Sequence, residues 1–243
     1  MFFVLLDALV WRALLGGGFS ETGPALYFLD VGQGDSQLIE LPPADSAKSH
    51  EPIQILIDGG PPNGKALAEL GKILPVHDTY LDLVIMTHPQ LDHFGGLIEV
   101  IKKYDVGVFV STGRSATIGA YGELEQVLSE RGVKHIAVDE GDVIRYGESF
   151  LSVLSPNARA LASRELNDTG VVLMLAAGNL RALYTADAGA DIEARLVRDN
   201  DQAAHVLKVG HHGSKSSTRK RILSEVEQQD ALEVGAGREL CAG

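Results

Sequence analysis

Short apolar runs alternate with polar turns along most of this chain, a pattern that predicts strands joined by helices. Strands are expected over residues 25–31, 37–41, 53–57, 81–86, 106–110, 134–138, 149–154, 171–176, 181–185 and 206–209. Helices are expected over residues 65–74, 95–104, 120–131, 191–198 and 220–228. Strands that alternate with helices after an initial run of strands indicate sheets covered by helices. The pattern therefore predicts an α/β fold.

The first 22 residues differ from the rest of the chain. Residues 1–19 are apolar apart from Asp7 and Arg12. This stretch is short for a bilayer span, which needs about 20 apolar residues, and it lacks the features of a clear signal peptide. Three interpretations stay open: the remnant of a membrane helix, a weak anchor, or a helix packed on the domain. Residues 23–243 show no obvious linker and are expected to form one domain.

Charge and cysteine content narrow the chemistry. The formal net charge of −12 disfavours general binding of nucleic acid, so any action on a polyanion would need a local basic patch or bound cations. Cys241 is the only cysteine, which excludes an internal disulfide and a cysteine-based zinc site. Any metal would have to be bound by histidines and carboxylates, which suit Zn, Mn or Fe. The sequence contains no Gly-x-Ser-x-Gly motif, which disfavours a serine hydrolase.

Three of the expected strands run directly into possible metal ligands. The strand over 81–86 is followed by His88, Asp92 and His93. The strand over 181–185 leads to Asp187, and the strand over 206–209 leads to His211 and His212. Each group alone has an ordinary explanation, such as a helix cap or a surface histidine. Together they can form a carboxylate-bridged centre with two ions about 3.5–4 Å apart.

Six motifs occur in one order along the chain and carry a specific resemblance. They are Phe28–Asp35, Ile57–Gly60, His88–Gly96, Asn167–Thr169, Thr185–Asp187 and Lys208–Ser214. In these motifs the sequence resembles the metallo-β-lactamase superfamily, whose ligand motif is His-x-His-x-Asp-His. More narrowly, it resembles the hydrolase domain of the competence DNA-internalisation protein ComEC. The resemblance covers residues 26 to about 217.

The resemblance implies a four-layer αββα sandwich with the site at the edge between the sheets. The implied metal ligands are His88, Asp92, His93, Asp187 and His212, with Asp187 shared between two ions. Asp92 and His211 are the implied catalytic residues, which would orient water and contact the substrate. The implied cofactor is a divalent metal, Zn or Mn, bound as one or two ions.

One position departs from the superfamily pattern. Gln90 stands where the superfamily has a second histidine, and a neutral amide is a weak ligand beside imidazole or carboxylate. The number of ions therefore stays open between one and two. The expected weak ligands or supports of the site are Gln90, Asn167, Asp168, Asp35 and Asp58.

The favoured function is hydrolysis by metal-activated water, with a phosphodiester as substrate and single-stranded DNA as the partner. Residues 203–223 contain five lysines and arginines and no acid, which places a basic stretch around the two adjacent histidines. Substrate contacts are expected from Lys208, Ser214 and Lys215. A solvated helix start explains the same charges equally well.

Two other functions stay open. One is an esterase, lactonase or β-lactamase acting on a small ester or lactam, because this fold serves many substrates. The other is a degenerate, non-catalytic module of a DNA-uptake channel, which Gln90 favours. In ComEC-like architecture this domain follows membrane helices. The chain is therefore expected to be membrane-associated through residues 1–22, or to be a soluble domain cut from a membrane protein.

Overall fold

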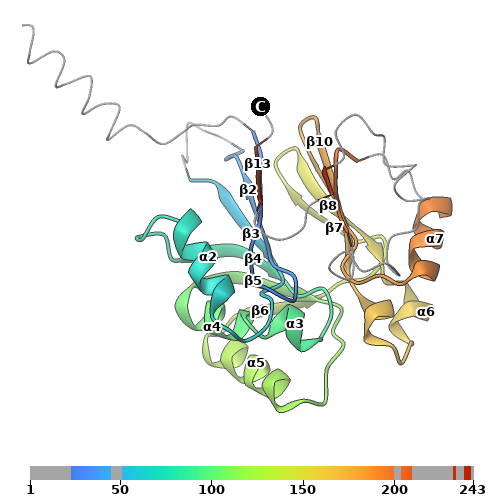
Figure 1. Ribbon diagram of the computed structural model, residues 1–243, viewed down its shortest axis with the longest axis horizontal. Coiled ribbons are helices and arrows are strands. Elements are labelled where there is room, and N and C mark those ends of the chain that lie inside the picture. The colour runs from blue at the N-terminus through green and yellow to red at the C-terminus, as the bar shows by residue number, and fades with distance from the viewer. Residues whose placement is uncertain (1–22, 45–50, 200–203, 210–231, 234–237, 242–243) are drawn as a thin grey trace, which may run out of the picture.

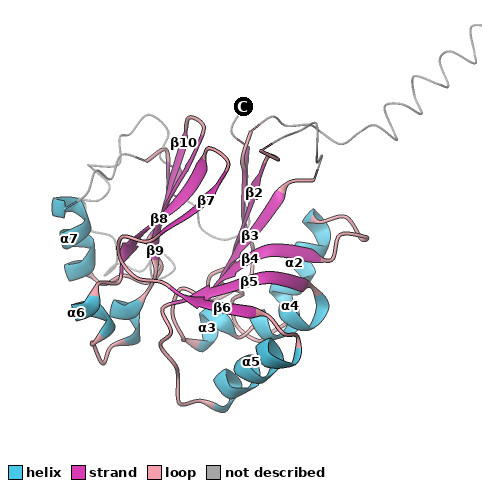
Figure 2. Ribbon diagram, turned by 180° about the vertical axis from the view of Figure 1, so that it is seen from behind, coloured by secondary structure: helices cyan, strands magenta, loops and turns pink. Residues whose placement is uncertain are grey.

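Two β-sheets pack face to face, and helices cover both outer faces (Figures 1 and 2). The computed structural model describes residues 23–44, 51–199, 204–209, 232–233 and 238–241. The apolar segment 1–22 and the helix expected over 220–228 lie outside these residues. The two sheets with outer helices confirm the expected α/β class and its four layers.

The first sheet has seven strands in the order β13-β1-β2-β3-β4-β5-β6. Their bounds are β13 Arg238–Cys241, β1 Ala25–Phe28, β2 Gln37–Leu41, β3 Ile53–Ile57, β4 Tyr80–Ile85, β5 Asp105–Ser111 and β6 Lys134–Ala137. The strands from β3 to β6 are parallel, whereas β1 and β2 form an antiparallel hairpin. The carboxyl ends of β3 and β4 therefore reach the same edge of the sheet.

The second sheet has six strands in the order β12-β11-β10-β9-β8-β7. Their bounds are β12 Leu232–Glu233, β11 Val206–Lys208, β10 Leu180–Tyr184, β9 Val172–Ala177, β8 Ser149–Ser155 and β7 Val143–Tyr146. The strands β10 and β11 are parallel, and Tyr184 pairs with Lys208 in their register. The residues that follow β10 and β11 therefore lie at the same edge of the second sheet.

Seven helical segments complete the described part of the chain. They are α2 Lys65–Ile73, α3 Leu91–Phe94, α4 Leu97–Lys103, α5 Gly119–Glu130, α6 Ala158–Leu161, the 3-10 turn η1 Leu166–Thr169 and α7 Ala190–Asp199. Helices α2, α4 and α5 cover the first sheet, and α6 and α7 lie on the side of the second (Figure 2). None of the helices in the described ranges has the length and apolar character that a bilayer crossing requires.

Alternating side chains divide the interior into three apolar layers. On β3, Leu56 faces the helices of the first sheet, whereas Ile55 and Ile57 face the second sheet. On β9, Leu173 faces the first sheet and Met174 packs with α7. Successive side chains of a strand point to opposite faces, so apolar residues at consecutive positions fill two layers at once. Because these strands are buried on both faces, they appear in the sequence as unbroken apolar runs.

The expected strands are present with small shifts in their ends, and the helix expected over 95–104 is α4, Leu97–Lys103. The separate turn of helix α3, which begins at Leu91 and includes His93, was not expected. Both Gly95 and Gly96 have helical backbone angles and continue from α3 into α4. A Cβ atom on Gly96 would collide with the carbonyl oxygen of Gly59. Glycine at this position allows the close approach of the two backbone segments.

Candidate metal centre

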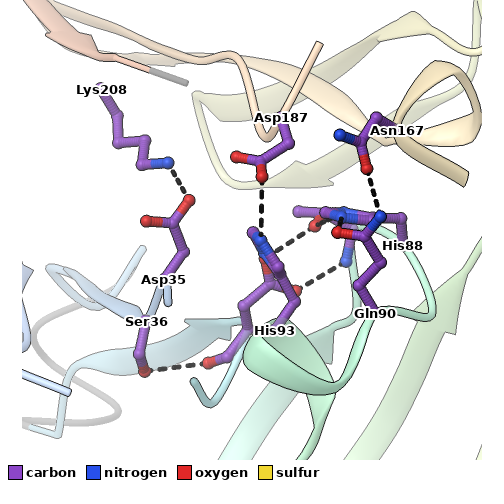
Figure 3. A network of polar contacts seen from close by, with 10 residues as sticks. Asp35, Ser36, His88, Gln90, His93, Asn167, Asp187 and Lys208 are labelled. Atoms are coloured by element: carbon purple, nitrogen blue, oxygen red, sulfur yellow. Dashed lines mark hydrogen bonds and ion pairs between the residues drawn. The ribbon is translucent and has the colours of Figure 1, made fainter. Parts of the chain in front are cut away.

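Three buried side chains from separate elements meet where the two sheets come together (Figure 3). They are His88, His93 and Asp187, and each offers a ligand atom within 4.8 Å of the others'. Both histidines are 0% exposed and Asp187 is 4% exposed. The two imidazole rings lie 4.1 Å apart between centroids. This is the cluster of potential ligands that the structure offers among its described residues.

The ends of the strands determine where these side chains lie. His88 follows β4 by three residues, and His93 lies in α3, the turn of helix that comes next. Asp187 follows β10 of the opposite sheet. Ala186, just before it, has a positive φ of 49°, a conformation that costs energy for a residue with a Cβ. Directly after this turn, the side chain of Asp187 points toward His93 of the first sheet (Figure 3).

One carboxylate, Asp58 at the end of β3, orients His93. The Oδ2 atom of Asp58 lies 2.8 Å from Nδ1 of His93. Because a carboxylate only accepts hydrogen bonds, Nδ1 carries the hydrogen and donates it. The other ring nitrogen, Nε2, then faces Asp187, with its Oδ2 atom 3.4 Å away. Such a carboxylate behind a histidine is the usual support of a metal-binding imidazole.

The same carboxylate orients His88 through Thr87. The backbone N–H of Thr87 donates to Asp58 Oδ1 at 2.8 Å, and its hydroxyl donates to Asp58 Oδ2 at 2.6 Å. The hydroxyl has no second proton, so Oγ1 must accept from Nδ1 of His88, 2.9 Å away. Both histidines therefore carry a hydrogen on Nδ1, which makes Nε2 the nitrogen through which each imidazole would bind a metal.

The two histidines have opposite pKa shifts. Burial, followed by the neighbouring His93, lowers the pKa of His88 to about 4, so this ring is neutral near pH 7. Burial also opposes the charged form of His93, but the carboxylates of Asp58 and Asp187 outweigh it and raise the pKa to about 10. Without an ion, His93 is an imidazolium between two carboxylates. A divalent cation could replace that proton between His93 and Asp187.

Gln90 and Asn167 lie on the other side of His88. The Oε1 atom of Gln90 is 3.2 Å from Nε2 of His88. The amide nitrogen of Gln90 donates to Oδ1 of Asn167 at 2.5 Å, which connects the α3 loop to η1 (Figure 3). The ring nitrogen that would bind an ion on this side therefore faces an amide.

Asp35 and Lys208 form a buried ion pair beside the cluster. Lys208 is 4% exposed, and its ammonium group contacts the Asp35 carboxylate. The backbone N–H of Asp35 donates to the carbonyl oxygen of Asp92, so the pair supports the motif that contains His93. Burial lowers the pKa of Lys208 to about 7, whereas the adjacent carboxylate favours the charged form. Lys208 is therefore buried and paired with Asp35, whereas a substrate contact was expected of it.

The other expected residues fall in three groups. Asp92 is half-buried on α3 and is not part of the three-residue cluster. Asp168 accepts a hydrogen bond from the Ser163 hydroxyl at 2.7 Å. The positions outside the described residues are His211, His212, Ser214 and Lys215. Their proposed roles stay predictions.

Two residues of the network did not appear in the sequence analysis as site residues. Thr87 links Asp58 to His88, and Ser36 donates to the carbonyl oxygen of Asp58 at 2.9 Å. Each carries a hydroxyl group and is adjacent in sequence to an expected site residue, and only this adjacency could have indicated a role. Both contact Asp58, which is 29 residues from Thr87 and 22 from Ser36, so these contacts depend on the fold.

The ligand types in the cluster fit a divalent transition metal. Two imidazoles and one carboxylate are typical ligands of Zn²⁺ or Mn²⁺ in hydrolytic sites. The nitrogen–oxygen separation of 3.4 Å between His93 and Asp187 is longer than the 2.7–2.9 Å typical of a charged hydrogen bond. It is compatible with two ligands on one ion, at bond lengths of about 2.0–2.2 Å each.

The family model of the metallo-beta-lactamase superfamily matches residues 54–237 of the chain. With the two helix-covered sheets and the buried histidine–aspartate cluster, this match shows that the chain belongs to that superfamily. In general terms, the protein is a hydrolase of the metallo-β-lactamase fold.

Within the superfamily, the chain is similar to two curated bacterial proteins. It is 30% identical to ComE operon protein 3 of Bacillus subtilis over 228 residues, and this match covers 86% of this chain and 28% of that protein. It is 32% identical over 214 residues to Recombination protein 2 of Haemophilus influenzae, covering 86% of this chain and 24% of that protein. The chain thus spans about a quarter of the length of these relatives. The resemblance to the ComEC group is confirmed.

Solved structures with low sequence identity share the fold. The metallo-β-lactamase fold protein YhfI from Bacillus subtilis has a TM-score of 0.56 at 12% identity, covering 90% of this chain and 99% of that one. Rm3 metallo-beta-lactamase has a TM-score of 0.54 at 15% identity, covering 83% and 86% of the two chains. These similarities support the architecture and carry no argument about substrate.

Proposed function

We propose that this protein is a metal-dependent phosphodiesterase that cleaves single-stranded DNA during DNA uptake. The observation that carries the metal dependence is that one carboxylate, Asp58, holds Nδ1 of His93 directly and Nδ1 of His88 through Thr87, which makes Nε2 the metal-binding nitrogen of each ring and turns that of His93 toward Asp187. A cluster this deeply buried needs a charge to balance its carboxylates. A divalent ion balances them better than a proton on His93, because it can also be bound by several ligands.

Within the described residues, His93 and Asp187 would hold the ion, with His88 next to them. A bound divalent ion would supply an activated water near neutral pH and would polarise the scissile bond. The role of the chain itself is orientation, because Asp58 and Thr87 fix the tautomers of the two imidazoles. Asp92 remains the proposed residue for orienting the attacking water, with His211 proposed to contact the substrate.

The choice of substrate draws on two further observations. The curated relatives are named for the ComE operon and for recombination. Residues 203–223 contain five basic side chains and no acid, in a protein with a net charge of −12. A local basic stretch is what an acidic protein requires in order to approach a polyanion. Association with a membrane through residues 1–22 is proposed on the sequence pattern of that segment.

The test is cleavage of labelled single-stranded DNA with Mn²⁺ or Zn²⁺ by the wild type and by His93→Ala, Asp187→Ala and Asp92→Ala. Cleavage that needs metal and falls at least about a hundredfold in His93→Ala and Asp187→Ala is expected, because each removes a proposed ligand. His77→Ala, which changes an exposed histidine, is the matched control and should cleave normally.

Two outcomes would contradict the proposal. A wild type that binds metal but leaves DNA intact would exclude the nuclease and direct the search to small esters, lactones and β-lactams. A wild type that binds no metal and cleaves nothing would favour a non-catalytic module of a DNA-uptake channel.

A further inference from the structure

The two histidines of the cluster face different partners. Nε2 of His93 faces a carboxylate oxygen of Asp187 at 3.4 Å. Nε2 of His88 faces the side-chain amide of Gln90 at 3.2 Å. A carboxylate carries a full negative charge that attracts a cation, whereas an amide is neutral and offers a hydrogen-bond donor as well as an acceptor. The two sides of the cluster therefore differ in what they can bind.

The directions of the hydrogen bonds around His88 determine whether Nε2 of this ring requires a donor or an acceptor as its partner. The Thr87 hydroxyl gives its proton to Asp58, and Nδ1 of His88 gives its hydrogen to Thr87. Nε2 then carries a lone pair and no hydrogen, so its partner must be either a cation or a hydrogen-bond donor. With Oε1 turned toward Nε2, two acceptors face each other. Rotating the Gln90 amide by half a turn replaces the oxygen by an NH₂ group of nearly the same shape and removes this conflict.

Asn167 allows that rotation. It lies 2.5 Å from the far end of the Gln90 amide, and its own amide also offers a donor and an acceptor. With both amides turned, Asn167 donates to Gln90, Gln90 donates to His88, His88 donates to Thr87, and Thr87 donates to Asp58. Each of these four hydrogen bonds then joins a donor to an acceptor. The His88 side is thereby satisfied by hydrogen bonds alone.

We propose that the centre holds a single divalent ion, between His93 and Asp187, and that the amides of Gln90 and Asn167 close the His88 side in place of a second ion. A second ion there would have one imidazole, two neutral amides and, among the described carboxylates, only a share of Asp187 as its nearest ligands, which is a weak set. The inference rests on the metal dependence proposed above and decides the number of ions, which the sequence left at one or two.

The test is metal content after saturation with Zn²⁺ and removal of excess metal by gel filtration. The wild type should retain one ion per chain, and the double variant Gln90→His/Asn167→His should retain two. The matched control is Gln126→His, which introduces a histidine at an exposed position of α5 and should stay at one ion. With Mn²⁺, the wild type should show the electron paramagnetic resonance signal of an isolated ion, and the double variant that of a coupled pair.

The possible outcomes separate this inference from the proposed function. Two ions in the wild type would overturn the single-ion centre but leave the hydrolase proposal standing. One ion in the double variant, shown to be folded by circular dichroism, would overturn the role of the amide pair. Should the double variant not fold, Gln90→Asp tests the same point, because a carboxylate there should raise the content above one ion. A wild type that binds no ion would overturn both proposals, whereas one ion without DNA cleavage supports this inference and removes only the nuclease.

Discussion

Lys208 on β11 forms a buried ion pair with Asp35, although 173 residues separate the two in sequence. Asp35 lies in the connection between β1 and β2 of the first sheet, so the pair joins the two sheets beside the histidine cluster (Figure 3). Its backbone also holds the segment of Asp92 and Gly60. The pair therefore links the stability of the fold to the position of the α3 motif.

Breaking this pair on one side should strongly destabilise the protein. Lys208→Met leaves the Asp35 carboxylate buried without its cation, and we expect a loss of about 3–5 kcal/mol in the free energy of unfolding. Asp35→Asn/Lys208→Met should lose less, because no charge is then buried alone. The measurement is urea unfolding followed by circular dichroism.

An exposed ion pair provides the matched control for that experiment. Lys102 and Glu123 are both about half exposed, and Lys102→Met should cost less than about 1 kcal/mol. A Lys208→Met variant no less stable than this control would show that the buried pair contributes no more than a surface pair.

Replacing Asp58 should weaken metal binding without removing a ligand. Asp58→Asn keeps the shape of the side chain and tolerates the positive φ of 57° at this position. It loses the second carboxylate oxygen that accepts from both Thr87 and His93, so neither tautomer is fixed. We expect metal affinity to fall about 10–100-fold, as measured by competition with a chromogenic chelator. Unchanged affinity in a folded variant would show that the orientation of the two imidazoles does not limit binding.

Metal binding should release a proton from His93. The pKa of this residue is raised from 6.5 to about 10 in the metal-free protein, so the ring is protonated in the folded state at pH 7.5. An ion must displace that proton, so its affinity should rise about tenfold per pH unit between about pH 7 and 9. Isothermal titration calorimetry in two buffers of different ionisation enthalpy measures the proton release directly. No release at pH 7.5 would mean that His93 is neutral before the ion arrives.

The same shift makes the stability of the metal-free protein depend on pH. A raised folded pKa contributes stability that is fully present below pH 6.5 and is lost as the pH rises through about 10. We therefore expect chelator-treated wild type to lose stability over this range more steeply than His93→Gln, which lacks the titrating group. Parallel curves for the two proteins in urea unfolding would contradict the raised pKa.

Close backbone packing at Gly96 should not tolerate a side chain. A Cβ atom there would collide with the Gly59 carbonyl oxygen, and the chain beside it is held by the hydrogen bond from Gly59 N–H to the His93 carbonyl. We expect Gly96→Ala to cost about 1–3 kcal/mol in thermal or urea unfolding. Gly122→Ala on α5 is the control, because a Cβ atom there meets no neighbour within 4 Å and should be neutral or slightly stabilising. Equal stability of the two variants would contradict the packing argument.

The sequence by itself determined the α/β class, most strand positions and the identity of the cluster residues. These properties are local: a buried strand shows as a run of apolar residues, and a ligand at its end shows as the histidine or aspartate that follows. His88 and Asp187 were found in this way, one after β4 and one after β10. The turn of helix α3 was not predicted, because its four residues are too few to show a helical period.

Only the tertiary structure decided how these residues are connected. Asp58 contacts His93 across 35 residues, Gln90 contacts Asn167 across 77, and Asp35 contacts Lys208 across 173. The Asp58–His93 contact forms because the parallel strands β3 and β4 end at one edge of the first sheet, whereas the other two contacts join segments of the two sheets. All three depend on how the apolar faces pack. Local sequence patterns carry no information about which polar side chains such packing brings within hydrogen-bonding distance. The tautomers of the histidines, the amide beside His88 and the buried partner of Lys208 are therefore properties of the fold.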